Sequence, residues 1–367
     1  MSDARYMALA LQLARRGLYT TDPNPRVGCV LVNDGDIVGQ GWHERVGEPH
    51  AERHALAQAG ERARGATAYV TLEPCSHHGR TPPCAEGLIE AGVTRVVAAM
   101  EDPNPQVSGR GLAKLQAAGI EIHRGLMRAE AEALNPGFIQ RMRCGRPYVR
   151  CKLAMSLDGR TAMAAGESRW ITAAQARADV HRLRARSSAV VTGIGTVMSD
   201  DPSLNARVAG LAGDALKQPL RVVLDSHLSM PATAKMLTLP GETLVVTTVG
   251  GSDAAEPLIK AGAEVVCLPA KAGKVDLTAL LERLARREIN EVLVEAGAEL
   301  AGGFLRAGLL DELIVYLAPH IMGDQARGLF HLPGLDSMDQ RIALDIEEIR
   351  AVGKDWRITA RPLERSV

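Results

Sequence analysis

Three residues of this sequence have the types and the placement expected of ligands to a catalytic zinc ion. His50 begins one expected helix, Cys75 follows an expected strand, and Cys84 begins a second expected helix. One imidazole and two thiolates provide three ligands of a tetrahedral zinc and leave the fourth position for water. A helix N-terminus also favours ionised or metal-bound groups, so the pattern predicts a zinc site.

Glu52 distinguishes a catalytic zinc from a structural one. It lies two residues after His50, close enough to reach a zinc-bound water without being a ligand. Zinc lowers the pKa of such a water toward ~7, and a carboxylate can carry its proton to a ring nitrogen and to departing ammonia. Structural zinc usually has four protein ligands, which would leave this acid without a task. We therefore favour a catalytic zinc over a structural zinc or unrelated thiols.

The separation of the two cysteines departs from the general signature of zinc deaminases. That signature reads H-x-E followed by P-C-x-x-C, whereas residues 76–83 separate Cys75 from Cys84 here. The longer loop counts against a simple nucleic-acid deaminase and brings further polar side chains over the site, Arg80 among them. A zinc-stabilised binding protein without turnover is the other alternative, and the non-ligand Glu52 counts against it.

Two other histidines are not assigned as ligands, and the four other cysteines lack ligand spacing. His54 packs beneath the site or faces solvent, and the sequence leaves the role of His43 open. We expect the remaining cysteines to be buried small hydrophobes rather than a disulfide framework: Cys29, Cys144, Cys151 and Cys267.

Motifs along essentially the whole chain resemble one known family. The segments that carry the resemblance are 23–28, 47–52, 71–84, 102–105, 152–160, 168–172, 200–202 and 294–297. In this order they resemble the bifunctional deaminase–reductases of riboflavin biosynthesis, in which the long loop between the cysteines is the usual form.

The resemblance implies two reactions on phosphorylated ribosylaminopyrimidines. A zinc-dependent domain would remove the 2-amino group of 2,5-diamino-6-(5-phosphoribosylamino)pyrimidin-4-one. A second domain would then reduce the ribosyl group of 5-amino-6-(5-phosphoribosylamino)uracil to ribityl with NADPH. The resemblance also implies that Asn24 holds the pyrimidine and that Arg80 meets the substrate phosphate, a partner that suits a guanidinium.

Without the resemblance, the second half carries only a weak cofactor signal. The segment 192–196 follows an apolar strand, but Met198 occupies the place of a third glycine, so the dinucleotide fingerprint is incomplete. Gly297, Gly302 and Gly303 flank a helix start, where backbone amides can bind phosphate. Tight packing between a strand and a helix is the competing explanation for these glycines.

The resemblance assigns ligand contacts in this half. NADPH would contact Ala154, Trp170, Thr196, Asp200, Ser226, Gly297, Ala298, Glu299, Leu300, Ala301, Gly302 and Gly303. The second substrate would contact Ser168, Arg184, Leu204, Arg207 and Glu295. The two arginines suit a phosphate, although surface arginines would look the same, and Trp170 has the alternative of a core aromatic.

Reduction of the sugar needs a proton donor and a group that holds the ring-opened chain. The acceptor is the C1 carbon of an opened ribosylamine, which is an imine carbon. Lys152 and Glu295 are our candidates; a strand-edge cation and a helix N-cap carboxylate are the alternatives. The sequence does not assign acid and base between them.

Strands that alternate with helices predict an α/β fold in both halves. The expected elements of the first half are the helices 4–16, 51–64 and 83–91 and the strands 27–32, 37–42, 66–72 and 95–100, with a hairpin turn at 33–36. Those of the second half are the strands 148–155, 188–192, 220–224, 243–249, 263–268 and 291–294 and the helices 173–186, 253–261, 276–287 and 298–306.

The pattern breaks at an expected turn, 135–137, and a basic segment, 141–147, so we place a domain boundary there. Residues 1–145 are expected to be a zinc-dependent pyrimidine deaminase and 146–367 an NADPH-dependent reductase. With the resemblance, the expected folds are a zinc cytidine-deaminase-like α/β sandwich and a dihydrofolate-reductase-like α/β domain.

The amino-acid composition limits the classes of molecule that this protein is expected to bind. The 367 residues include 43 Lys plus Arg and 43 Asp plus Glu, and only 3% are aromatic, which argues against a nucleic-acid binder. No apolar run is long enough to span a membrane and no signal-peptide core is present. We expect a cytoplasmic homo-oligomer that acts on small phosphorylated pyrimidines.

Overall fold

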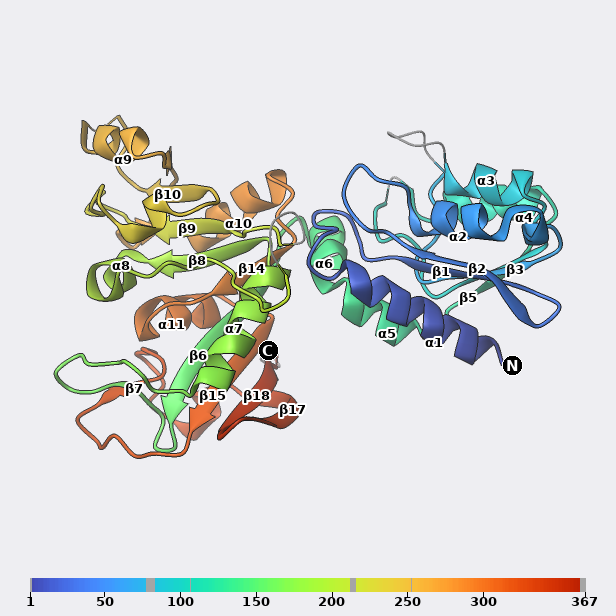
Figure 1. Cartoon of the computed structure of the whole chain (residues 1–367). Helices are drawn as coiled ribbons and strands as arrows, with labels where there is room; N and C mark the ends of the chain where they lie inside the picture. Colours follow the sequence, from blue (N-terminus) through green and yellow to red (C-terminus); the bar gives the residue numbers. More distant parts are fainter. Residues whose placement is uncertain (1, 77–82, 106, 212–215, 252, 364–367) are drawn as a thin grey trace. The chain divides into compact units, whose positions relative to one another are not determined.

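The computed structural model describes residues 2–76, 83–105, 107–211, 216–251 and 253–363. The chain divides into two compact units, Met1–Arg146 and Pro147–Val367, each of which is built around its own sheet (Figure 1). Within the described ranges, no helix is both long and apolar enough to cross a membrane.

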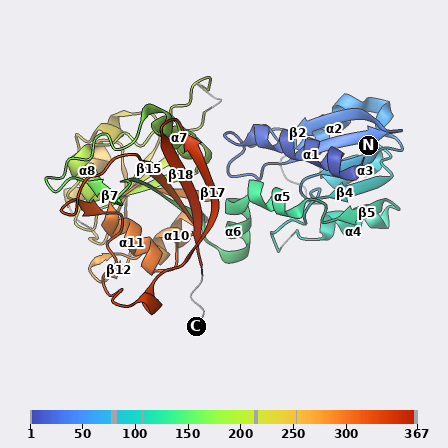
Figure 2. The same ribbon diagram turned by 90° about the horizontal axis from the view of Figure 1, so that it is seen from below.

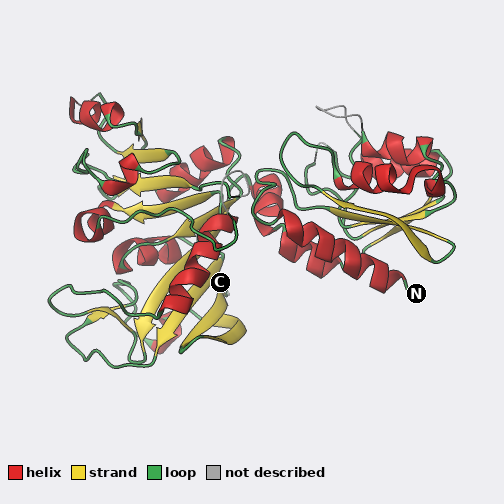
Figure 3. Ribbon diagram, in the orientation of Figure 1, coloured by secondary structure: helices red, strands yellow, loops and turns green. Residues whose placement is uncertain are grey.

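The first unit is a sheet with helices on both faces. Its strands are β1 (Gly28–Asn33), β2 (Asp36–Trp42), β3 (Thr67–Val70), β4 (Arg95–Ala98) and β5 (Glu121–Arg124). Its α-helices are α1 (Asp3–Ala14), α2 (Ala51–Ala59), α3 (Cys84–Glu90), α4 (Arg110–Ala117), α5 (Arg128–Leu134) and α6 (Pro136–Cys144). The strand order is β2-β1-β3-β4-β5. Helices α2, α3 and α4 cover one face and α1 and α5 the other (Figure 3).

The hairpin predicted at 33–36 is confirmed. Strands β1 and β2 pair antiparallel, with Asn33 opposite Asp36. The two residues between them have positive φ, 50° at Asp34 and 84° at Gly35. Two left-handed residues give the turn the twist that a two-residue hairpin needs, and Asp-Gly tolerates it.

The turn predicted at 135–137 is wrong, because these residues lead into helix α6. Pro136 is the first residue of this helix, where a missing N–H costs no hydrogen bond. Gly145, with φ of 67°, ends the helix in the left-handed conformation that glycine adopts readily. Both residues therefore mark the ends of a helix rather than a linker.

The second unit is built on a larger, mostly parallel sheet. The strands that form it are β6 (Tyr148–Ser156), β8 (Ala189–Gly193), β9 (Leu220–Leu224), β10 (Thr243–Thr247), β11 (Glu264–Cys267), β14 (Glu291–Val294), β15 (Glu312–Ala318), β17 (Leu344–Val352) and β18 (Asp355–Pro362). Their order is β11-β10-β9-β8-β14-β6-β15-β18-β17, and only β18 and β17 run antiparallel to their neighbours. The short strands β7 (Arg160–Ala162) and β16 (Arg327–Gly328) pair separately, as do β12 (Ala270–Lys271) and β13 (Lys274–Val275).

In the described part of this unit, five α-helices cover the two faces of the sheet. They are α7 (Ala174–Arg186), α8 (Ile194–Asp200), α9 (Glu256–Lys260), α10 (Leu277–Arg286) and α11 (Ala298–Arg306). Buried side chains of α10 and α11 pack with one face, and those of α7, α8 and α9 with the other. Figure 2 shows α10 and α11 on the opposite side of the sheet from α7. The carboxyl ends of the parallel strands therefore share one edge, where α/β sheets bind ligands.

The expectation of four packing cysteines is half right. Cys29 and Cys151 are buried in strands, as predicted, whereas Cys144 and Cys267 are exposed. Cys144 is the last residue of α6 and Cys267 the last of the edge strand β11. A residue at the end of a helix or of an edge strand has few neighbouring side chains to bury it. The sequence pattern did not reveal that these two cysteines lie at such ends.

Candidate active sites

The first unit brings together the three predicted metal ligands. Nδ1 of His50 lies 3.5 Å from Sγ of Cys75 and 3.3 Å from Sγ of Cys84, and the three ligand atoms lie within 4.8 Å of one another. His50 is the extended N-cap of α2, and Cys84 is the first residue of α3 after Pro83. No other such group of histidines, cysteines and carboxylates occurs among the described residues.

The spacing fits one tetrahedral zinc ion. Zinc binds histidine nitrogen at about 2.0 Å and cysteine sulfur at about 2.3 Å, which puts the two ligand atoms about 3.5 Å apart at the tetrahedral angle. Both observed separations lie close to this value. With three protein ligands, the fourth position is left for water, as in catalytic zinc sites.

The two thiols differ in their environment. The pKa of Cys75 is lowered to about 4, first by its hydrogen bond with Cys84 and then by His50. The pKa of Cys84 is raised, first by Cys75 and then by burial. A divalent cation between the two sulfurs would favour the thiolate form of both.

Glu52 is a buried acid beside these ligands. It lies in the first turn of α2 and is 3% exposed. Burial first, and then the charge of Cys75, raise the pKa of Glu52 to about 7. A carboxyl that titrates near neutral pH can both accept and return a proton, which is the property that general acid–base catalysis requires.

A second histidine, whose role the sequence left open, joins Asn24 to this site. The ring of His43 packs edge-on against that of His50, with centroids 5.3 Å apart. Its Nδ1 lies 3.2 Å from the carbonyl oxygen of Pro49, and its Nε2 lies 3.1 Å from Nδ2 of Asn24. Arg80, the predicted phosphate contact, lies outside the described residues.

In the second unit, the predicted residues lie on the elements that meet at the carboxyl edge of the parallel sheet. Lys152 and Ala154 lie in β6, Glu295 follows β14, and Ser226 follows β9. Thr196 and Asp200 lie in α8, a helix that the glycines of the segment 192–196 hid from the sequence reading. The predicted cofactor segment 297–303 forms the N-cap and first turns of α11.

The structure pairs two of these residues directly. Arg184, on α7, donates from Nε to Oε1 of Glu295 at 2.6 Å and from Nη2 to Oε2 at 2.9 Å. Its Nη1 donates to the carbonyl oxygen of Asn205 at 3.1 Å. Burial alone would raise the pKa of Glu295, but this guanidinium holds it below its usual value.

Lys152 lies near this pair without joining it. Among the described residues, its ammonium has no hydrogen-bonded or ion-paired partner, and its nitrogen lies 5.8 Å from the ring centroid of Tyr316. Burial lowers the pKa of Lys152, and Glu295 opposes this only in part. Lysines with this environment are often functional.

His181 is a member of this cluster that the sequence reading missed. Its Nε2 lies 3.0 Å from Nη2 of Arg207, and Arg207 also donates to Oδ1 of Asn205 at 2.6 Å. Burial, followed by the nearby guanidiniums of Arg184 and Arg207, lowers the pKa of His181 to about 4. Its position one helical turn before Arg184 was the available signal.

Other predicted contacts have more varied surroundings. Trp170 is 70% exposed, which excludes a core role, and Arg177 stacks over its ring at 4.5 Å. A Cβ on Gly302 would lie 2.3 Å from the carbonyl oxygen of His331, so close backbone packing already explains that glycine. Glu299 is paired with Lys274.

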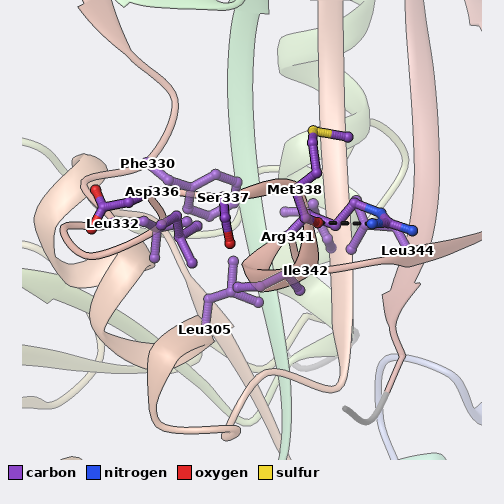
Figure 4. A pocket seen from close by; sticks show the side chains of 11 residues that line it. Leu305, Phe330, Leu332, Asp336, Ser337, Met338, Arg341, Ile342 and Leu344 are labelled. Atoms are coloured by element: carbon purple, nitrogen blue, oxygen red, sulfur yellow. Dashed lines mark hydrogen bonds between the residues drawn. The ribbon is translucent and has the colours of Figure 1, made fainter. Parts of the chain in front are cut away.

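The remaining predicted positions are in loops or in the same helix. Ser168 and Leu204 are in loops, and Leu204 is buried with φ of 48°. Ala298, Leu300, Ala301 and Gly303 are in α11. An apolar pocket of about 540 Å³ lies elsewhere, between the end of α11 and the segment leading into β17, and contains none of the predicted site residues (Figure 4).

Both units match known families. Residues 1–100 match the family model for the cytidine and deoxycytidylate deaminase zinc-binding region, and residues 147–358 match that for the RibD C-terminal domain. Riboflavin biosynthesis protein RibD of Escherichia coli K12 is 53% identical, over 97% of this chain and 98% of its own length. The Haemophilus influenzae protein of the same name is 50% identical, over 98% and 97%.

Solved structures match over the full chain as well. The structure of Acinetobacter baumannii RibD, form 1, matches with a TM-score of 0.92 at 45% identity. The match covers 99% of this chain and 99% of that chain. A Thermotoga maritima structure has a TM-score of 0.87 at 33% identity, with 98% of this chain and 99% of that chain covered. The predicted fold class, a cytidine-deaminase-like domain followed by a dihydrofolate-reductase-like domain, is confirmed. The chain therefore belongs to the RibD family and is a bifunctional enzyme of riboflavin biosynthesis, with a zinc-binding deaminase domain and a reductase domain that implies a nicotinamide cofactor.

Proposed function

We propose that the first domain removes the 2-amino group of 2,5-diamino-6-(5-phosphoribosylamino)pyrimidin-4-one, with zinc held by His50, Cys75 and Cys84. The observation that carries the proposal is the convergence of these three ligand atoms beside the buried acid Glu52. The Thermotoga maritima relative supports the choice of substrate, since it is described as a diaminohydroxyphosphoribosylaminopyrimidine deaminase/5-amino-6-(5-phosphoribosylamino)uracil reductase.

Glu52 is the proton carrier of this reaction. When bound, zinc would lower the pKa of a water molecule and make hydroxide available at neutral pH. Glu52, with a pKa of about 7, takes the proton of that water and passes it to the ring nitrogen beside the attacked carbon. A second transfer to the exocyclic nitrogen lets ammonia leave and completes the exchange of an amino group for oxygen.

Asn24 and His43 orient the pyrimidine. Nδ1 of His43 faces the carbonyl oxygen of Pro49, which only accepts, so this nitrogen carries the ring proton. Nε2 then accepts from the amide nitrogen of Asn24. The amide oxygen of Asn24 is thereby directed to accept from an N–H group of the substrate. Arg80 remains our proposal for the substrate phosphate by resemblance alone.

We propose that the second domain reduces the ribosyl group of 5-amino-6-(5-phosphoribosylamino)uracil to ribityl with NADPH. The residues that would hold the cofactor are Ala154, Trp170, Thr196, Asp200, Ser226 and the segment 297–303. They fit such a group, because a Cβ added to Gly195 or Gly297 would meet open space at the carboxyl edge of the sheet. Gly297 also begins α11, whose N-terminus suits a phosphate. When bound, NADPH would supply the hydride.

Lys152 is the proton donor of this reduction. Opening of the ribosylamine ring yields an imine, whose C1 receives the hydride and whose nitrogen takes a proton. Glu295 cannot give that proton, because the bidentate Arg184 keeps its carboxylate ionised. The ammonium of Lys152, which makes no hydrogen bond or ion pair among the described residues and lies near the ring of Tyr316, can. Glu295 instead accepts from hydroxyl groups of the opened sugar.

The substrate phosphate is bound mainly by Arg207. Arg184 is the other predicted phosphate contact. Its Nε and Nη2 already donate hydrogen bonds to Glu295, and its Nη1 donates to the carbonyl oxygen of Asn205. Arg207 is exposed and directs its guanidinium toward His181 and Asn205. Ser168 and Leu204 complete our proposed substrate contacts.

One coupled assay tests both reactions. The purified chain is incubated with the diaminopyrimidine substrate with NADPH, with NADH, or with neither, and products are identified by mass. We expect the deaminated product and ammonia without cofactor, and the ribityl product with NADPH in preference to NADH. Absence of ammonia release would refute the deaminase proposal, and equal rates with the two cofactors would refute the choice of NADPH. We place both reactions in the cytoplasm, which the composition of the sequence favours.

We further propose that a second copy of the chain covers the outer part of the second sheet. The edge strand β17 exposes Leu344, Ile346 and Ile349, the last two at 56%, beside the apolar pocket lined by Phe330 and Met338. Exposed apolar side chains on an edge strand favour pairing with an identical edge. Light scattering should give a dimer that Ile346→Glu dissociates; a wild-type monomer would refute the proposal.

A further inference from the structure

A buried carboxylate behind the metal centre gathers four backbone N–H groups. Glu73 is 5% exposed. Its Oε2 accepts from the amides of Asp102 at 3.0 Å and Gly109 at 2.9 Å, and its Oε1 accepts from those of Gly111 at 2.8 Å and Leu112 at 3.2 Å. Both oxygens of Glu73 are therefore occupied by backbone donors.

These four bonds connect two segments to the loop after β3, which contains the proposed metal ligand Cys75. Helix α4 has no side-chain cap of its own at Gly109, so Glu73 supplies acceptors for the free amides of its first turn. The amide of Asp102 begins the segment 102–105, which the resemblance singled out and neither reaction uses. Glu73 therefore joins this segment and α4 to the residues immediately before Cys75.

The backbone of α4 also approaches the chain just before Cys75 closely. A Cβ on Gly111 would lie 1.9 Å from the carbonyl oxygen of Pro74, the residue between Glu73 and Cys75. On the other side, the amide of Ala85 donates to the carbonyl of Cys75 at 3.1 Å, and the amide of Cys84 donates to its sulfur at 3.3 Å. The chain before Cys75 is thus held by α4, and Cys75 itself by α3.

We propose that Glu73 is a positioning residue of the deaminase centre, which sets the Cys75 sulfur by anchoring the chain before it to the start of α4. It is not a ligand, since both of its oxygens already accept from backbone amides. The inference rests on the proposed zinc ligands. Residues that hold metal ligands in place typically change metal affinity by about 10–100-fold when they are replaced.

The test is zinc retention by Glu73→Gln. The amide turns an N–H group toward backbone donors, so two of the four bonds become repulsive while the size of the side chain is kept. We expect zinc to transfer to a chelator about 10–100-fold faster than from the wild type. Reductase turnover of the same molecules should not change, which provides an internal control for folding.

Two further variants separate positioning from stability. Gly111→Ala displaces α4 from Pro74 with Glu73 intact and should also accelerate zinc loss. Leu115→Ala removes a fully buried side chain of α4 and should lower the melting temperature of the domain with a much smaller effect on zinc loss. Wild-type zinc retention in both Glu73→Gln and Gly111→Ala, or equal loss in Leu115→Ala, would overturn the inference. A wild type without zinc would instead refute the proposed ligands.

Discussion

Two glutamates with little exposure, one in each domain, have pKa values shifted in opposite directions. Glu52 has no cationic side chain paired with its carboxylate among the described contacts, and burial raises its pKa to about 7. Glu295 is comparably enclosed, but the two-pronged contact with Arg184 holds its pKa below the usual value. The same residue type is therefore suited to proton transfer in one domain and to the ionised form in the other.

The two sites also differ in how they are assembled. The proposed metal centre takes its ligands from two helix starts and the loop after β3, all within residues 50–84. The reductase site collects side chains from β6, α7 and the end of β14, far apart in sequence. Its charges are set by neighbours rather than by a central ion, so partner substitutions should change it gradually.

The largest expected effect is in the metal centre. Cys75→Ser removes one of three ligands, and we expect loss of zinc and of detectable deamination, with reductase turnover retained. The exposed Cys144→Ser is the matched control. Metal analysis and ammonia release measure the outcome, and full zinc content in the Cys75 variant would contradict the ligand assignment.

Removal of the proposed proton carrier, Glu52, should have the next largest effect. Glu52→Gln keeps the shape of the side chain but cannot carry a proton, so we expect deamination to fall about 10²–10⁴-fold with zinc content unchanged. The exposed Glu48→Gln serves as the control. A near-normal rate in the Glu52 variant would remove its role and with it the contrast between the two glutamates.

Loss of the proposed donor tests the reductase half. Lys152→Met should lower reduction about 10²-fold, the lower end of the usual range for acid–base groups, because water can replace the donor only in part. Lys260→Met, at an exposed position of α9, should have no effect. Deamination provides the internal control, and an unaffected rate of NADPH oxidation would exclude Lys152 as donor.

Arg184→Met should make Glu295 resemble Glu52. In the wild type, the depressed pKa of Glu295 contributes stability above its unfolded value near 4.5, and this is lost as pH falls through the folded value. Without the guanidinium, burial should raise the pKa, so stability should instead fall as pH rises above about 4.5. Melting temperatures of the second domain from pH 4.5 to 8 measure this, and Glu295→Gln in the same chain should remove the slope.

The smallest effect is expected from separating the domains. Residues 147–367 form a compact unit with their own core, so this fragment should reduce the deaminated substrate within about twofold of the full chain. Steady-state NADPH oxidation measures it. A folded but inactive fragment would mean that the reductase site depends on the first domain.

Several elements were predictable because their local signals are strong. Strands β9 and β14 and helix α11 have the predicted ends, since short apolar runs and a glycine start delimit them. Helix α8 was missed because Gly193 and Gly195 read as a loop. Strand β17 was missed because nearly all of its residues are exposed, which removes the alternation that marks a half-buried strand.

The sequence by itself determined the family, the fold class and the metal ligands that we propose, because a histidine, two cysteines and an acid at set spacings leave few chemical alternatives. Only the tertiary structure decided the directions in which the pKa values of Glu52 and Glu295 are shifted, the pairing of Arg184, and the contacts of His181 and Glu73. These depend on burial and on neighbours distant in sequence, since a pKa is set by the local dielectric and by nearby charges, neither of which a residue type specifies.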